Sequence, residues 1–186
     1  MRPTLCTIDT SCIIALDHLD LIPQLSWLFS TVLIPKAVRE DLFKRRNTKK
    51  RVQLYLETYA FIERCDDYEK GAVDLLLVDR MFQGMKDRGE VEAIVQAVQR
   101  GATVIVDDLW GRELAEKHDL NHHGTTWVLQ RLFELGLMSS AKARSCFVSL
   151  RDRGTRLPKE AVDEFLLRIG EAPLFRKPEA SCDNLI

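Results

Sequence analysis

Hydrophobic positions along this chain form short apolar runs that alternate with longer stretches of helical spacing. The apolar runs predict buried strands at residues 4–8, 31–34, 59–63, 103–106 and 121–123. Apolar residues three and four apart predict helices at residues 11–18, 35–43, 73–81, 90–99, 112–117, 125–134, 141–150 and 158–169. Strands that alternate with helices indicate an α/β domain with a mostly parallel central sheet of about five strands.

Acidic residues stand where these strands end or the helices begin. They are Asp9 after the first strand, Asp107 and Asp108 after the fourth, Glu40 and Asp41 in the helix opened by Pro35, and Glu90 at the start of the helix predicted at residues 90–99. Ligands of such sheets bind outside the carboxyl ends of the strands, where the strand order reverses. If the first and fourth strands are neighbours there, Asp9 meets Asp107 and Asp108 in one crevice.

A cluster of carboxylates points to metal chemistry. Like charges repel and burial raises the free energy of each charged group, so a fold retains such a cluster when something offsets the repulsion. Mg²⁺ or Mn²⁺ does so, because hard cations prefer carboxylate oxygens and water. A cation held in this way polarises a phosphodiester and activates a water molecule for in-line attack.

Composition sets broader bounds. The 186 residues suffice for one domain with a real core, and the net charge of −1 provides no global basic field that would announce nucleic acid. Five cysteines form no CxxC pair, which favours reduced thiols in a cytoplasmic protein. We expect neither a signal peptide nor a membrane helix, since no apolar run approaches the roughly 20 residues that a span requires.

One local charge pattern bears on nucleic acid. A dense basic run follows the acidic pair Glu40 and Asp41. It contains Lys44, Arg45, Arg46, Lys49, Lys50 and Arg51. Such a run is most often a solvated face. Its position after the acidic pair favours a second interpretation, in which it binds RNA phosphates.

Together, the acidic segments resemble the motifs of PIN-domain proteins. Residues 8–11 are similar to the first motif, residues 33–42 to the second, and residues 89–94 to the GExEAI segment of one bacterial and archaeal branch. Residues 106–108 resemble the fourth motif of that branch, and residues 124–125 its next segment. The resemblance covers roughly residues 4–140, and the order and spacing of the motifs make it specific.

This resemblance implies a fold, an activity and a set of site residues. The fold is a doubly wound α/β/α sandwich with residues 1–140 as a nuclease domain, 141–170 as a helical extension packed on it and 171–186 as a disordered tail. The activity is an Mg²⁺- or Mn²⁺-dependent endoribonuclease, in many relatives a toxin paired with an antitoxin. The implied catalytic residues are Asp9, Asp41, Glu90 and Asp108, and the implied metal ligands are Asp9, Glu40, Asp41, Glu90, Asp107 and Asp108, with Thr10 and Ser11 supporting Asp9.

Within the second motif, the family's glutamate directly precedes a leucine, which makes Asp41 the positional match, whereas Glu40 keeps the residue type one position early. Adjacent helical residues point about 100° apart, so one of the two faces the site. For the extra helices after residue 140, three roles stay open: covering the site, binding a partner or forming a homodimer surface.

Each acid also has a purely structural interpretation. Asp9 suits the N-cap of a helix, Glu90 suits a first helical turn, and Asp107 and Asp108 suit a turn. A phosphatase with an aspartate nucleophile is disfavoured, because its second aspartate would replace Ser11. No glycine-rich nucleotide loop is present. The remaining rival to a nuclease is a PIN-like module that binds RNA or protein without cleaving it.

Overall fold

The computed structural model describes residues 4–44, 46–82 and 88–176 of the chain, and for helical residues 46, 47 and 78–82 it describes the backbone alone. By contact, the chain divides into two compact units, residues 1–128 (unit 1) and residues 129–186 (unit 2). None of the described helices is long and apolar enough to cross a membrane.

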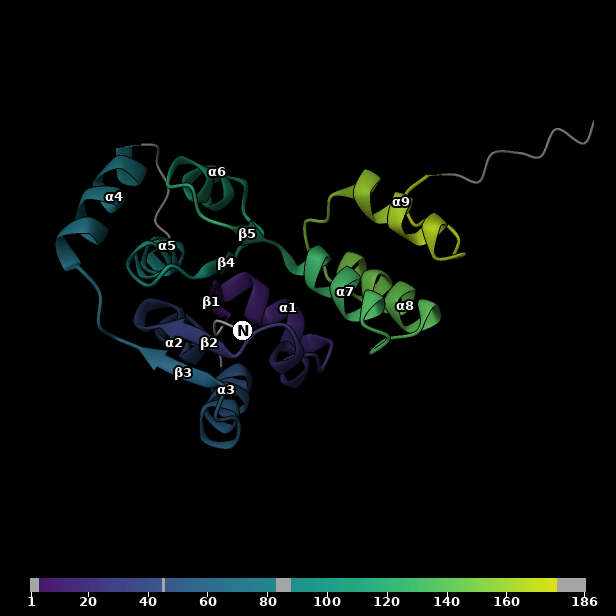
Figure 1. The fold of residues 1–186 in the computed structure, drawn as a ribbon, viewed down its shortest axis with the longest axis horizontal. Coiled ribbons are helices and arrows are strands. Elements are labelled where there is room, and N and C mark those ends of the chain that lie inside the picture. Colours follow the sequence, from purple (N-terminus) through teal and green to yellow (C-terminus); the bar gives the residue numbers. More distant parts are fainter. Residues whose placement is uncertain (1–3, 45, 83–87, 177–186) are drawn as a thin grey trace, which may run out of the picture. The chain divides into compact units, whose positions relative to one another are not determined.

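Within its described residues, unit 1 is built on a five-stranded parallel sheet (Figure 1). The strands are β1 (Leu5–Ile8), β2 (Thr31–Pro35), β3 (Ile62–Cys65), β4 (Thr103–Ile105) and β5 (His122–His123), in the order β3-β2-β1-β4-β5. Strand β1 pairs in parallel with both β2 and β4, so the strand order reverses at β1 and β4. The predicted α/β fold is confirmed, and the first and fourth strands are neighbours.

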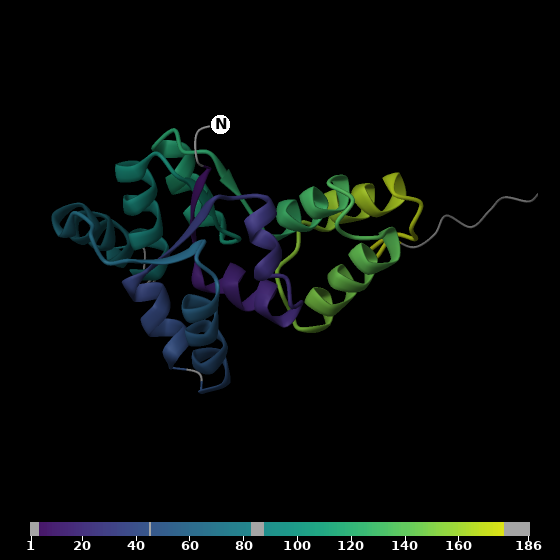
Figure 2. The same cartoon turned by 60° about the horizontal axis from the view of Figure 1, so that its bottom comes forward.

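The helices of unit 1 follow the strands. They are α1 (Thr10–His18), the short 3₁₀ helix η1 (Pro23–Trp27), α2 (Lys36–Phe43), α3 (Arg46–Thr58), α4 (Lys70–Phe82), α5 (Arg88–Arg100), α6 (Leu109–Lys117) and the start of α7 (Thr125–Glu134). Helix α5 packs against β1, β2 and β4, with α2, α4 and α6 around it. Figure 2 shows α3 beside α2, with which it is in contact.

One strand prediction was displaced and one helix was missed. The third strand was expected at residues 59–63, but it starts at Ile62, because Tyr59 N–H donates to the Tyr55 carbonyl and prolongs the turn that ends α3. Helix α3 itself begins within the basic run, where charged residues hide the apolar spacing. Its buried residues Val52 and Tyr55 lie three apart and form the inner face.

The core of unit 1 forms where α5 and α6 meet the sheet. Ile94 and Ala97 of α5 pack with Val104 of β4, with Val106, and with Leu114 of α6. All are nearly or fully excluded from solvent. Burial of each large aliphatic side chain stabilises the fold by about 1.5–3 kcal/mol. This packing fixes the end of β4 against α5, and the acids of both elements are held with it.

Unit 2 contains α8 (Ser140–Asp152), α9 (Lys159–Arg168) and the remainder of α7. Phe165 of α9 meets the rings of Phe133 and Phe147 edge-on, at centroid distances of 5.7 and 5.9 Å. The buried Asp163 accepts backbone hydrogen bonds from residues 174, 175 and 176, which holds this part of the segment predicted to be a disordered tail. Burial alone raises the pKa of Asp163, but these hydrogen bonds outweigh it and leave the pKa below its ordinary value.

Candidate functional site

Asp9 lies at the carboxyl end of β1 and caps α1. Its Oδ1 accepts a hydrogen bond from Cys12 N–H at 2.7 Å, and the Ser11 hydroxyl lies 3.0 and 2.9 Å from its two carboxylate oxygens. Its own N–H donates to the Ile105 carbonyl at 3.1 Å, which ties Asp9 to β4. The buried hydroxyl of Thr10 has no hydrogen-bond partner among the described residues, so of the two supporting residues only Ser11 contacts Asp9 by a side-chain hydrogen bond. The N-cap interpretation of Asp9 therefore holds, and the same contacts place its carboxylate at the β1–β4 boundary.

Asp107 follows β4 on the neighbouring side of that boundary. Its Oδ1 accepts from Thr125 N–H at 2.8 Å and its Oδ2 accepts from the Thr125 hydroxyl at 2.6 Å. Arg112 Nη2 lies 3.6 Å from Oδ1, and Arg112 Nε donates to the Val106 carbonyl at 3.3 Å. The Asp107 side chain retains 14% exposure, so its carboxylate is held from one side and reaches solvent on the other.

Asp9 and Asp107 interact electrostatically. Burial, with a smaller contribution from the charge of Asp107, raises the pKa of Asp9 from 3.8 to about 6, even though the hydrogen bonds from Cys12 and Ser11 oppose the rise. Burial also raises the pKa of the Cys12 thiol well above its ordinary value, and the charges of Asp107 and Asp9 add to that rise. A cation beside Asp9 and Asp107 would relieve this repulsion.

Asp108 and Glu90 lie around the first turn of α6. Asp108 caps this helix, with its Oδ2 accepting from Trp110 and Gly111 N–H at 3.0 and 3.4 Å. Glu90 is 6% exposed, and a Cβ built on Gly111 would stand 3.7 Å from its Oε2. Gly111 is needed here because that Cβ would also lie only 2.5 Å from Val106 Cγ2. Of the adjacent pair after β4, Asp107 contributes by its charge to the raised pKa of Asp9, and Asp108 caps α6.

Glu40 and Asp41 form ion pairs within α2 and its end. Glu40 Oε1 lies 3.8 Å from Lys36 Nζ and its side chain is 61% exposed. Asp41 pairs with Lys44, and its side chain is 33% exposed. Because Asp41 lies closer to the buried face that Val38 and Leu42 form, it is better placed than Glu40 to reach the sheet edge.

Glu92 is a buried acid of α5 that the spacing of apolar residues does not single out. Its side chain is 1% exposed. Its Oε2 accepts from Ala37 N–H at the start of α2, and its Oε1 accepts from Tyr68 and Arg88 at 2.8 Å each. The apolar spacing of α5 did not reveal this role, because α5 is covered by the sheet and by neighbouring helices on several sides. Glu92 joins α5 to the start of α2.

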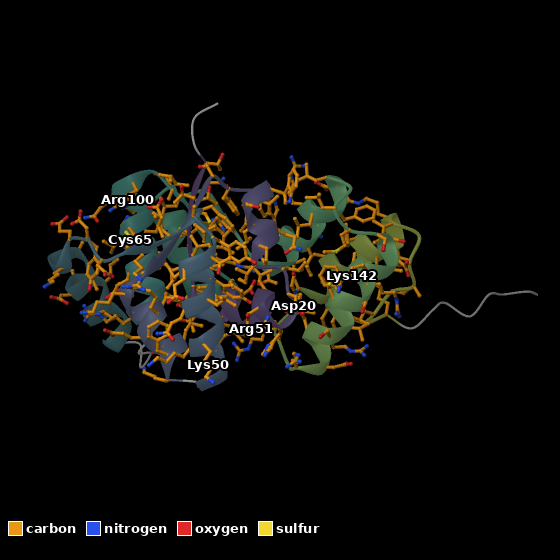
Figure 3. All side chains as sticks on the ribbon, turned by 90° about the horizontal axis from the view of Figure 1, so that it is seen from below. Asp20, Lys50, Arg51, Cys65, Arg100 and Lys142 are labelled. Atoms are coloured by element: carbon orange, nitrogen blue, oxygen red, sulfur yellow. The ribbon has the colours of Figure 1, made fainter. Side chains whose placement is uncertain are left out.

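The basic run divides between structural and solvent-facing residues. Arg51 donates to Asp17 and Asp20 at 2.6 Å each and to Tyr55 at 3.0 Å, so it fastens α3 to the end of α1. Figure 3 shows Arg51 beside Asp20, with Lys50 further out on α3. Lys49 lies 5.6 Å from the centre of the Phe43 ring. Arg45 and the side chain of Arg46 lie outside the described residues.

The acids differ in how well they fit a metal. Among the described side chains, no group of three or more His, Cys, Asp or Glu residues gathers closely enough to hold an ion. Asp9 and Asp107 do come together, and both offer oxygen atoms only. Mg²⁺ commonly retains several waters and uses one or two protein carboxylates together with substrate phosphates. The donor chemistry of this pair fits such a cation.

Replacing Gly124 by Ala is expected to disturb the position of Asp107. A Cβ there would lie 2.5 Å from Asp107 Oδ1 and 2.6 Å from Arg112 Nη2, so both side chains would have to move. We expect a loss of about 1–3 kcal/mol in the free energy of unfolding, measured by urea denaturation. The matched control is Gly71→Ala in α4, where a Cβ meets nothing within 4 Å and stability should be kept or slightly raised. Equal stability of Gly124→Ala and the wild type would contradict the geometry.

The chain is similar to one family of proteins and to a solved structure. The family model described as DUF3368, a PIN domain, matches residues 5–171. The crystal structure of VapBC2 from Rickettsia felis, bound to a DNA fragment from their promoter, contains a chain similar to this one at 13% sequence identity and a TM-score of 0.47. The similarity covers 65% of this chain and 98% of the other. No curated protein matches the sequence.

Proposed function

Since this chain belongs to the PIN domain family, we propose that it is a metal-dependent ribonuclease that hydrolyses RNA phosphodiester bonds. Membership of the family confirms the resemblance to PIN-domain proteins, while the branch with the GExEAI segment stays a prediction. Members of this family are generally nucleases, and they generally depend on divalent metal. One observation carries the proposal for this chain: Asp9 and Asp107 meet where the strand order reverses, and burial together with Asp107 raises the pKa of Asp9 to about 6.

Asp9 and Asp107 are the residues that we propose to hold Mg²⁺ or Mn²⁺. Glu90 is the next candidate ligand, followed by Asp41 in preference to Glu40, and Asp108 acts first as a helix cap. When bound, the metal supplies Lewis-acid polarisation of the phosphodiester and an activated water. The protein contributes orientation: Ser11 and Cys12 N–H fix the Asp9 carboxylate, and Thr125 fixes that of Asp107.

RNA is the proposed substrate, and basic residues around α3 are proposed to bind its phosphates. Lys44, Lys49 and Lys50 are exposed and suit this role, with Arg45 and Arg46 beside them in sequence. Arg51 is 45% exposed while it pairs with Asp17, so its contribution to RNA binding would be smaller. Each phosphate contact should appear as salt dependence of binding.

Two further proposals concern the protein's partners and a form of the protein that binds without cleaving RNA. Family resemblance motivates an antitoxin partner, and the helices of unit 2 offer a surface for it or for a homodimer. A module that binds RNA or protein without cleavage is the second candidate, because no group of three metal-binding side chains gathers among the described residues.

The proposed function is tested with purified protein and mixed RNAs. We expect cleavage in Mn²⁺ and none when EDTA replaces the metal. Asp119→Asn serves as a control for Asp→Asn changes at the proposed metal site. Asp119 is exposed, and Asn tolerates its left-handed backbone at φ 54. Cleavage that persists in EDTA would contradict metal dependence. RNA binding without cleavage under every metal condition would favour the inactive module.

A further inference from the structure

Thr125 makes unusually complete contact with Asp107. It is fully buried and is the first residue of α7. Its backbone N–H and its hydroxyl each donate to a different oxygen of the same carboxylate, at 2.8 and 2.6 Å. The two residues are 18 positions apart along the chain. One residue therefore holds both oxygens of Asp107.

Two donors on two oxygens fix the plane of a carboxylate. The terminal torsion of an aspartate is otherwise broad, so the group would rotate about its Cβ–Cγ bond. An ionised carboxylate has about four lone-pair sites, and Thr125 occupies two of them. Arg112 Nη2 also approaches Oδ1, at 3.6 Å, and a cation would bind the lone pairs that neither residue uses. Mg²⁺ demands near-ideal octahedral geometry, and so it gains from a ligand whose orientation is already set.

Other contacts around Asp107 cannot replace Thr125. Arg112 approaches a single oxygen at 3.6 Å and is 32% exposed, so solvent screens its interaction. The buried Cys12 thiol interacts with the side chains of both Thr125 and Asp9. Thr125 thus lies in contact with the Asp107 carboxylate and, through Cys12, with the surroundings of Asp9.

We propose that Thr125 is a positioning residue that orients Asp107 for binding of the divalent cation. This inference rests on the proposed function and deepens it. Partners that orient a metal ligand typically contribute 10–100-fold to metal affinity or activity. The contribution of Thr125 should therefore be visible in Mn²⁺ affinity as well as in cleavage.

The test compares three variants of the full chain. Thr125→Val keeps the shape and the backbone N–H but removes the hydroxyl, whereas Thr125→Ser keeps the hydroxyl. Thr126→Val makes the same chemical change at the next buried residue of α7. Mn²⁺ affinity is measured by calorimetry, kcat and KM are measured with RNA, and circular dichroism reports the folded fraction. We expect Thr125→Val to weaken Mn²⁺ binding and lower kcat by about 10–100-fold, with KM little changed, while Thr125→Ser and Thr126→Val remain close to the wild type.

The outcomes separate this inference from the function on which it rests. If Thr125→Val binds Mn²⁺ as tightly as the wild type and only its melting temperature falls, Thr125 is a structural cap and the inference is overturned alone. It is likewise overturned if Thr125→Ser loses as much affinity as Thr125→Val. If the wild type itself neither binds Mn²⁺ nor cleaves RNA, the proposed function is overturned and this inference with it.

Discussion

Replacing Asp107 by Asn is expected to lower kcat for RNA cleavage by at least about 100-fold, whereas the same change at Asp108 should leave most activity. Loss of a direct ligand removes several kcal/mol of transition-state stabilisation, and each 1.36 kcal/mol corresponds to a tenfold change in rate. Asp107 acts electrically on Asp9. Asp108 instead accepts from Trp110 and Gly111 N–H, which Asn can still satisfy through its side-chain oxygen.

The measurement is single-turnover cleavage of a labelled RNA in Mn²⁺, with Asp119→Asn as the control. Both Asp→Asn variants conserve volume, so unfolding should be small, and circular dichroism would detect it. The assignment of Asp107 over Asp108 would be wrong if Asp108→Asn were the more damaging change. Equal activity of the wild type and all three variants would contradict a metal site at either aspartate.

Asp9→Asn is expected to stabilise the metal-free protein at pH 8. The folded-state pKa of Asp9 is raised from 3.8 to about 6, which corresponds to about 3 kcal/mol of unfavourable free energy for the charged group. Asn carries no charge and can accept the Cys12 N–H bond, so we expect a gain of about 1–3 kcal/mol and a rise in melting temperature of about 2–10 °C.

The pH dependence of this gain has a definite sign. Because the folded-state pKa lies above the unfolded one, the native state binds a proton more tightly between pH 3.8 and about 6. The wild type therefore gains stability as pH falls through this window, and it loses that stability as pH rises through about 6. The advantage of Asp9→Asn should be full above pH 7 and vanish near pH 4.

Thermal melts with EDTA at several pH values measure this effect, and Mn²⁺ provides a second arm. Added Mn²⁺ should raise the melting temperature of the wild type but leave Asp9→Asn nearly unchanged, since a ligand stabilises only the protein that binds it. A metal-free Asp9→Asn protein that is less stable than the wild type at pH 8 would show that capping of α1 outweighs the burial of charge. Such a result would weaken the argument that Asp9 is held in place for function.

The sequence predicted the elements of the fold well where apolar runs were distinct. Strands β1, β2 and β4 lie within about a residue of their predicted bounds, because buried parallel strands are apolar on both faces. β3 was misplaced, since its two middle residues are exposed and its pattern carries little apolar signal. α3 was missed for a related reason: a dense basic run covers its start.

Within the candidate site, the sequence could name the acids but could not choose between neighbours. Asp107 and Asp108 are adjacent, and either one could match the acid of the family's fourth motif. In the structure the two differ in their contacts: Asp108 caps α6, which begins at Leu109, whereas the charge of Asp107 contributes to the raised pKa of Asp9. The sequence placed Thr125 in a family-like segment but could not reveal its role or that of Glu92, since these roles depend on partners 18 and 55 residues away.

Taken alone, the sequence determined the parallel α/β architecture and placed acids at the ends of β1 and β4. Those features follow from local periodicity and from chain order, which a linear pattern records. Only the tertiary structure showed that the charge of Asp107 contributes to the pKa of Asp9 and that Asp108 caps α6. It also showed which buried donors orient the carboxylates of Asp9 and Asp107. Side-chain direction at a strand end depends on long-range hydrogen bonds and on packing around α5, and neither is written in the spacing of residues.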